Sequence, residues 1–134
     1  MCLFSKEEVP RIAQEDIECF KILQQKDGQW ITPYRDYPVE FNKVLEAINN
    51  NEFSKTHKYP TYIDYYAISE GYFHVCDSEK STRKHAEEIK IAYTRNKHKC
   101  PPLTGFKAII PKGSEYYIGV HGDLCSDKLI ILKE

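Results

Sequence analysis

Two side chains that could do chemistry, His74 and Cys76, stand two residues apart in the stretch GYFHVCDSEKSTRKHAEEI, residues 71–89. Side chains alternate between the two faces of a strand, so His74 and Cys76 are expected to share one face, with Phe73 and Val75 on the other. If Phe73 and Val75 face the core, the imidazole and the thiol face solvent or a cleft. A second interpretation is that both simply pack, since free cysteine is among the most buried residue types.

The same stretch predicts a helix that begins directly after the cysteine. Ser78 or the aspartate before it is a typical N-cap, and the predicted helix covers residues 78–95. The N-terminus of a helix lowers the pKa of a thiol and attracts anions, so Cys76 and Ser78 are candidates for a thiolate or for the rim of a phosphate pocket. Arg83 and Lys112 are candidates for holding a phosphate there.

The candidate catalytic side chains are far apart in the sequence, and their spacing alone does not predict that they meet in the fold. The candidates are His74 as a base or orienting group, with Cys76 or Asp127 as the second group. Five histidines and five cysteines are present, but they follow no HExxH or CxxC spacing. We therefore expect no metal site and no cofactor, and the sequence favours a non-catalytic protein over an enzyme.

Tyrosine is the most prominent residue type, with ten in the chain. Its flat apolar ring and its hydroxyl suit stacking on a base or anchoring a protein interface, and they equally suit the half-buried face of an ordinary sheet. Tyr72, Tyr116 and Tyr117 are the tyrosines expected to line a binding surface together with His74 and Cys76.

The elements that would position these residues follow from local patterns. An apolar run over residues 15–25, the dipeptide Asp27-Gly28 and a second short run predict an N-terminal hairpin. Phe41 begins an i, i+3, i+4, i+7 apolar pattern that predicts a helix over residues 39–49. The polar residues 51–60 predict a loop, and the aromatic-rich residues 61–75 predict two short extended pieces with a turn or bulge at Gly71.

Three β-rich runs, FKAII, EYYIG and KLIIL, predict a C-terminal β meander. Strands at both ends with two main helices, 39–49 and 78–95, predict an α+β fold built on small antiparallel sheets. By length the chain forms a single domain, residues 1–134, in which residues 1–14 are expected to be loosely ordered.

The composition excludes several classes of protein. Nineteen basic and twenty acidic residues leave a net charge of −1, which makes nucleic acid an unlikely partner. The first residues carry no apolar core of signal-peptide length, and no apolar run is long enough to cross a membrane, so we expect neither secretion nor membrane insertion. The five widely spaced cysteines argue against a disulfide framework and favour a reducing cytoplasm.

The segments GYFHVCDSEKSTRKHAEEI and FKAIIPKGSEYYIGVHGDLCSDKLIIL resemble a family of short uncharacterised bacterial and phage proteins. The shared features are a Gly-aromatic-His step, a helix, and an Ile-Pro-Lys-Gly step with a closing strand. More distantly, the same order resembles the second half of the ADP-ribosyltransferase fold, over about half of the chain. This resemblance implies a cleft beside the helix N-terminus.

The catalytic residues of that fold are missing from this sequence. Residues 74–76 are His-Val-Cys where the enzymes have Ser-Thr-Ser, and residues 125–127 are Cys-Ser-Asp where they have Glu-x-Glu. Residues 19–21, Cys-Phe-Lys, lack the arginine or histidine of the enzymes' first strand. Transferase chemistry would lose its main electrostatic support without the glutamate, so the resemblance implies the fold and not the enzyme.

The sequence therefore predicts a non-catalytic cytoplasmic binding module of the phage or bacterial accessory type. Its partner would be a protein or a small nucleotide-like ligand, and the oligomeric state is left open, a homodimer included. The alternative is a degenerate or divergent ADP-ribosyltransferase-like enzyme that acts on a nucleotide or a protein side chain.

Overall fold

The computed structural model describes residues 3–7, 9–33, 38–47, 57–58, 66–68 and 72–133, with only the backbone at residues 3, 4, 57, 58 and 66–68. Its elements in chain order are β1 (Leu3–Ser5), β2 (Arg11–Ile12), β3 (Ile17–Lys26), β4 (Gln29–Ile31), β5 (Val44–Glu46), β6 (His57–Lys58), β7 (Tyr66–Ile68), β8 (Phe73–Val75), α1 (Glu79–Arg95), β9 (Leu103–Ile110), β10 (Glu115–Ile118), β11 (Leu124–Ser126) and β12 (Lys128–Ile131). None of the described helical residues belongs to a segment long and apolar enough to cross a membrane.

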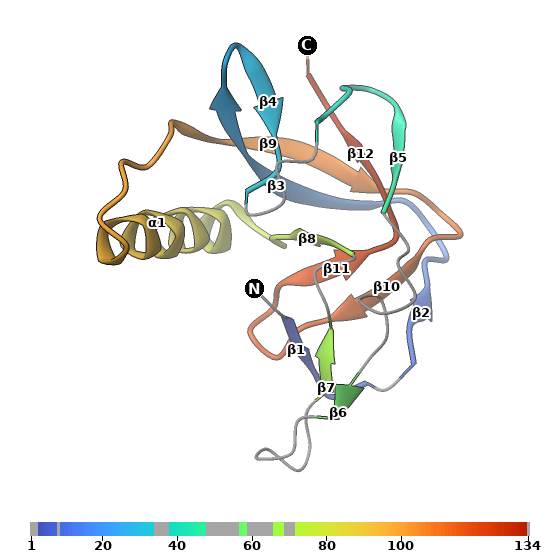
Figure 1. Cartoon of the computed structure of the whole chain (residues 1–134). Coiled ribbons are helices and arrows are strands. Elements are labelled where there is room, and N and C mark those ends of the chain that lie inside the picture. Colours follow the sequence, from blue (N-terminus) through green and yellow to red (C-terminus); the bar gives the residue numbers. More distant parts are fainter. Residues whose placement is uncertain are drawn as a thin grey trace.

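Two antiparallel sheets enclose the core (Figure 1). The five-stranded sheet has the order β4-β3-β9-β12-β5, and the four-stranded sheet has the order β2-β10-β11-β8. One bridge joins them, in which Phe20 of β3 and Cys76, directly after β8, exchange both backbone hydrogen bonds at 2.9 and 2.8 Å. A third sheet, in the order β1-β7-β6, completes the described strands.

The N-terminal hairpin is present where the sequence predicts it. β3 and β4 pair across the turn formed by Asp27 and Gly28, whose φ angles are 51° and 78°. Two consecutive residues with positive φ are the mark of a type I′ turn, whose twist matches that of the flanking strands.

The helix predicted over residues 39–49 is wrong. Residues 44–46 form β5, an edge strand paired with β12, and burial alternates along it, with Leu45 buried and Val44 exposed. Asn42 interrupts the segment with a φ of 60°, and its backbone N–H donates to Ile131 O at 2.8 Å. Pairing with β12 satisfies this backbone and buries Leu45, which outweighs the weak helical preference of the pattern.

The second predicted helix is present as α1. Ser78 is its N-cap, and its hydroxyl accepts from Ser81 N at 3.1 Å while Ser81 Oγ accepts from Ser78 N at 3.2 Å. This capping box satisfies donors that the first turn of a helix leaves without intrahelical partners.

The prediction of an α+β fold with two main helices and a C-terminal meander is therefore wrong. The described part of the chain is rich in strands and contains one helix. β9 and β12 lie in the five-stranded sheet, whereas the β10–β11 hairpin belongs to the other sheet. A meander would pair β9 with β10, but the chain crosses between the sheets at residues 111–114. One face of the β10–β11 hairpin, with Tyr116 and Leu124, then completes the opposite side of the core.

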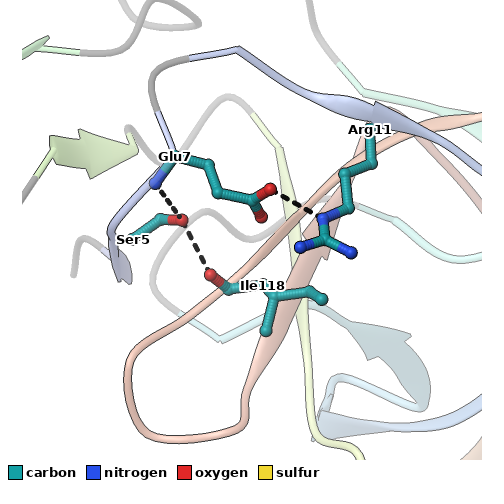
Figure 2. Close-up of polar contacts among 4 residues, drawn as sticks. All are labelled: Ser5, Glu7, Arg11 and Ile118. Atoms are coloured by element: carbon teal, nitrogen blue, oxygen red, sulfur yellow. Dashed lines mark hydrogen bonds and ion pairs between the residues drawn. The ribbon is translucent and has the colours of Figure 1, made fainter.

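The N-terminal segment is fastened to β10 by polar contacts (Figure 2). The buried Ser5 hydroxyl donates to Ile118 O at 2.7 Å and accepts from Glu7 N at 3.2 Å. Arg11 Nε donates to Glu7 Oε2 at 2.6 Å, and β2 pairs with β10 beside it. Glu7 Oε1 is buried without a hydrogen-bond partner.

Candidate functional site

The His74–Cys76 stretch forms β8 and the bridge residue after it. Phe73 and Val75 belong to the main core, and His74 is partly exposed. Cys76 is only 4% exposed, and burial raises the pKa of its thiol above the usual 9.0 despite a hydrogen bond with Thr82 and the nearby Lys21 ammonium. The expected lowering of this pKa is not found, so the Cys76 thiol stays protonated at neutral pH.

The N-terminus of α1 is occupied by the chain itself. Ser78 forms the capping box, and Asp77 Oδ1 accepts from Ser81 Oγ at 2.7 Å. The Asp77 carboxylate at this end already interacts favourably with the helix dipole. A phosphate bound there would therefore gain less stabilisation from the dipole. Arg83 lies exposed on α1.

The predicted tyrosines divide between two faces of the four-stranded sheet. Tyr117, Cys125 and His74 stand directly opposite one another on β10, β11 and β8, on the outer face. Tyr72 meets Tyr117 edge to face with ring centroids 5.8 Å apart. Tyr116 lies on the other face and packs against the main core. Thus Tyr72, His74 and Tyr117 come together, whereas Tyr116 does not join them.

Asp127 and Lys112 both make structural hydrogen bonds. Asp127 Oδ1 accepts from Glu115 N at 2.9 Å, which fixes the crossing from β11 into β12. The backbone N–H of Lys112 donates to Asp16 Oδ1 at 2.8 Å, and the residue is exposed. Neither residue lies in the row formed by Tyr117, Cys125 and His74.

Sequence reasoning missed Lys21, the most unusual ionisable group of the described residues. It stands in the middle of β3, is 8% exposed, and Nζ donates to His74 O at 2.8 Å. Burial lowers its pKa from 10.5 to about 8, and the neighbouring Cys76 and Cys19 offset part of that effect. Within the described part of the chain, no carboxylate lies at ion-pair distance from Lys21.

Lys21 occupies the point where β3 and β8 diverge. Cys76 directs its N–H and C=O toward β3, so His74, two residues earlier, does the same. The two strands share only the Phe20–Cys76 bridge, and β3 offers His74 O no further ladder donor. The Lys21 ammonium supplies that donor from the side of β3 that faces the core.

Three partly exposed aromatic rings cluster on the inner face of the five-stranded sheet, and one of them lies next to Lys21. Phe106 stands directly opposite Lys21 on β9, which places the Cβ atoms about 5 Å apart. Trp30 meets Phe106 edge to face at 5.1 Å, and Phe41 meets it tilted at 5.1 Å. We name Lys21, Trp30, Phe41 and Phe106 the Lys21 site.

His85 on α1 and Asp123 in the connection between β10 and β11 form a second pair of groups with shifted pKa values. Burial lowers the pKa of His85 and raises the pKa of Asp123, and each side chain feels the charge of the other. Lys21 also lowers the pKa of His85. His85 Nδ1 lies 3.6 Å from Glu88 Oε2. Clusters of ionisable groups with shifted pKa values occur preferentially at functional sites.

The Lys21 site combines a buried amine with aromatic rings, which suits an anion joined to a flat ring. The chemistry of stacking and of phosphate binding needs those two kinds of group. One sequence pattern could have indicated it, because Lys21 is a charged residue at an inward-facing position between the apolar residues Cys19 and Leu23. The described residues contain no group of three or more His, Cys, Asp or Glu side chains placed to hold a metal ion.

Comparisons of the chain with protein-family models, with curated proteins and with solved structures find no match.

Proposed function

We propose that this protein is a non-catalytic cytoplasmic binding module of the phage or bacterial accessory type that takes a small nucleotide-like ligand at the Lys21 site. The flat ring of the ligand stacks on Trp30 or Phe106, and its phosphate pairs with the Lys21 ammonium. The observation that carries the proposal is a buried lysine without a carboxylate at ion-pair distance in the described chain, directly opposite a partly exposed aromatic ring.

Electrostatics favours an anion at this position. A buried ammonium loses hydration that one carbonyl acceptor does not replace, as the lowered pKa of Lys21 records. An anionic group beside Nζ would restore the missing charge pairing in a medium where such pairs are strong. The aromatic rings would exclude water from the phosphate contact and hold the flat part of the ligand.

Binding is favoured over thiol catalysis by the state of the cysteines. Burial raises the pKa of Cys19 to about 12 and also raises the pKa values of Cys76 and Cys125. The thiolate is the nucleophile, and these three side chains stay as thiols at neutral pH. The described cysteines are all free, which supports a reducing compartment.

Tryptophan fluorescence tests the proposal directly, because Trp30 is the single tryptophan of the chain. We expect ADP and NAD to quench Trp30 emission saturably and to raise the thermal unfolding midpoint. A ligand at a hundred times its dissociation constant adds about 2.7 kcal/mol to the stability of the folded state. Lys21→Met should abolish both effects, whereas Lys84→Met, at an exposed position of α1, should leave them unchanged.

Absence of saturable quenching and of any midpoint shift with either nucleotide would refute the Lys21 site as a nucleotide site. Quenching that survives Lys21→Met would show that the ligand binds elsewhere. A shift lost in His74→Ala but retained in Lys21→Met would instead favour the outer face formed by Tyr72, His74 and Tyr117.

An alternative function, a divergent ADP-ribosyltransferase-like enzyme, is favoured by one observation. Lys21 has a pKa of about 8, so part of the amine is neutral at physiological pH and could serve as a base near His85 and Asp123. Incubation with NAD tests this function, since an enzyme would release nicotinamide at a rate that Lys21→Met abolishes. Binding of NAD without release would favour the non-catalytic module.

A further inference from the structure

The charged residues are unevenly distributed along the sequence. Residues 89–114 contain six lysines and arginines and no acidic residue. The rest of the chain contains thirteen basic and twenty acidic residues, which is a net charge of −7. The net charge of −1 for the whole chain therefore hides a basic segment within an otherwise acidic protein.

Three of these basic side chains follow one another closely where α1 ends. Arg95 is the last residue of the helix, and Lys97 and Lys99 lie in the connection to β9, which leaves the end of α1 that is farther from β8 (Figure 1). Lys99 is the fourth residue after Arg95, so the three Cα atoms span at most about 14 Å. We name Arg95, Lys97 and Lys99 the basic cluster.

The residues of the basic cluster are exposed and have no acidic partner in the described part of the chain. All three are exposed to solvent. Among the described residues, no carboxylate lies at ion-pair distance from any of them, whereas Lys90 on the same helix pairs with Glu87 Oε1 at 3.4 Å. The positive charges of the cluster are therefore open to an external anion.

The backbone at Lys97 shows that a lysine does not favour the fold at this position. His98 N donates to Tyr93 O at 3.0 Å and Lys97 N donates to Thr94 O at 3.1 Å, which are the two hydrogen bonds of a Schellman motif. Lys97 takes the left-handed position of that motif, with a φ of 57°. Glycine is the usual residue there, because a Cβ atom disfavours this conformation. Glycine would thus give a more stable helix end, and what lysine adds is its charge.

The helix dipole does not account for this charge. A basic residue in the last turn of a helix interacts favourably with the dipole, and Arg95 supplies it. The effect falls off within the last turn, and Lys97 and Lys99 lie beyond it. An interaction with a partner outside the chain does explain a lysine at this position.

An acidic peptide segment fits this surface better than a nucleic acid does. At physiological ionic strength exposed charges interact over about 8 Å, so the attraction is confined to the neighbourhood of the cluster. Three cations neutralise few phosphates, and a long polyanion would extend over the acidic remainder of the protein. A few neighbouring carboxylates cover the cluster without reaching that remainder, and they accept charge-assisted hydrogen bonds from arginine and lysine.

We propose that the basic cluster is a docking site for an acidic segment of a partner protein, whose carboxylates pair with Arg95, Lys97 and Lys99. The site is separate from the Lys21 site, because it lies in the connection between α1 and β9. Exposed ion pairs are individually weak, so the contact is sensitive to salt and readily reversible. It attracts and orients the partner, as complementary charges at the rim of an interface do.

NMR titration of the isotope-labelled full chain tests the proposal, with hexaglutamate as the probe. We expect saturable shifts of the amide signals of residues 95–99. Raising the salt concentration from about 20 to about 150 mM should weaken binding by about tenfold, because salt screens exposed charges. Hexaglutamine, which has the same length and no charged side chain, should cause no shifts.

Replacement of Lys97 by glycine separates binding from folding. Lys97→Gly should weaken the binding of hexaglutamate by about threefold, because one exposed ion pair is lost. The same variant should raise the thermal unfolding midpoint by about 3 °C, because it removes a Cβ atom from a left-handed position. Lys84→Gln makes the same change of charge at an exposed position of α1 outside the cluster, and should leave both quantities unchanged.

Three results would overturn the proposal. The first is the absence of shifts at residues 95–99 with hexaglutamate. The second is binding to Lys97→Gly as strong as to the wild type. The third is tighter binding of an oligothymidylate of the same charge to these residues, which would assign the basic cluster to nucleic acid.

Discussion

Replacement of Lys21 by methionine tests whether a charged amine is held in the interior. Methionine keeps an unbranched side chain of similar length and removes the ionisable group. Lys21 is 8% exposed, so the substitution removes a buried charge and leaves a packed side chain in its place. It also removes the hydrogen bond from Lys21 Nζ to His74 O, and the stability lost with that bond does not depend on pH.

The magnitude follows from the pKa of Lys21. Lowering from the usual 10.5 to about 8 corresponds to about 3 kcal/mol of disfavoured charging in the folded state. Below pH 8 the folded protein carries this full penalty. Between about pH 8 and 10.5 the unfolded chain binds more protons at this lysine than the folded protein does, so this residue's contribution to stability rises with pH.

We therefore expect the stability of the wild type relative to Lys21→Met to rise by about 3 kcal/mol between pH 7 and pH 11. Urea unfolding followed by circular dichroism at a series of pH values measures both proteins. The buried thiols, whose raised pKa values destabilise the fold at high pH, are present in both proteins. Lys21 acts on Cys19 and Cys76 only while it is charged, so above pH 8 the thiols contribute nearly equally to both proteins. Lys84→Met should show no such pH dependence, because Lys84 is exposed.

Parallel stability curves for the wild type and Lys21→Met would refute the reasoning. That result would mean that Lys21 titrates as a solvated amine, and the argument for an anion beside it would fail with it.

Three further predictions test other contacts. Ser78→Ala should lower the free energy of unfolding by about 1 kcal/mol, measured by urea unfolding, because the capping box loses its acceptor. Asp127→Ala should cost about 1 kcal/mol or more, since Glu115 N loses its acceptor at 2.9 Å; Asp127→Asn, which keeps an acceptor oxygen, should restore most of the loss. The buried thiols are Cys19, Cys76 and Cys125. Iodoacetamide at neutral pH should leave them unmodified until the protein unfolds, as mass spectrometry would measure. Rapid labelling of any of the three in the native protein would contradict their burial.

Local turn and cap chemistry could be predicted from the sequence. Asp27 and Gly28 adopt the positive φ angles that the dipeptide favours, and Ser78 caps α1. Such features depend on a few neighbouring residues, and their physical causes are visible in the sequence itself.

The region around Phe41 could not be predicted, because its structure depends on β12. An apolar spacing of three and four residues fits a helix, but here Phe41 packs on Phe106 while Leu45 enters the core from an edge strand. Asn42, with its positive φ, is hydrogen-bonded to Ile131 and Lys133, about ninety residues away. Which sheet each C-terminal strand would join depended on similar long-range pairing.

In the candidate site too, locally determined features could be predicted from the sequence, and features that depend on long-range strand pairing could not. The sequence correctly placed His74 on a strand and Cys76 between that strand and a helix, yet it did not indicate the burial of the thiol. Lys21, Trp30 and Phe106 come together only through the pairing of β3 with β4 and β9. Residues that converge through strand register leave no short motif in the sequence.

The long ladder between β3 and β9 has a consequence for how the chain folds. It pairs Ile17 with Ile110 and continues to Gln24 and Leu103, so β3 waits for residues far along the chain to complete the larger sheet. The entropy of closing so large a loop is lost before the ladder gains its hydrogen bonds, which makes folding slow. During synthesis, β3 lacks its longest pairing until β9 emerges, and the edge that β9 will cover is exposed to aggregation until then.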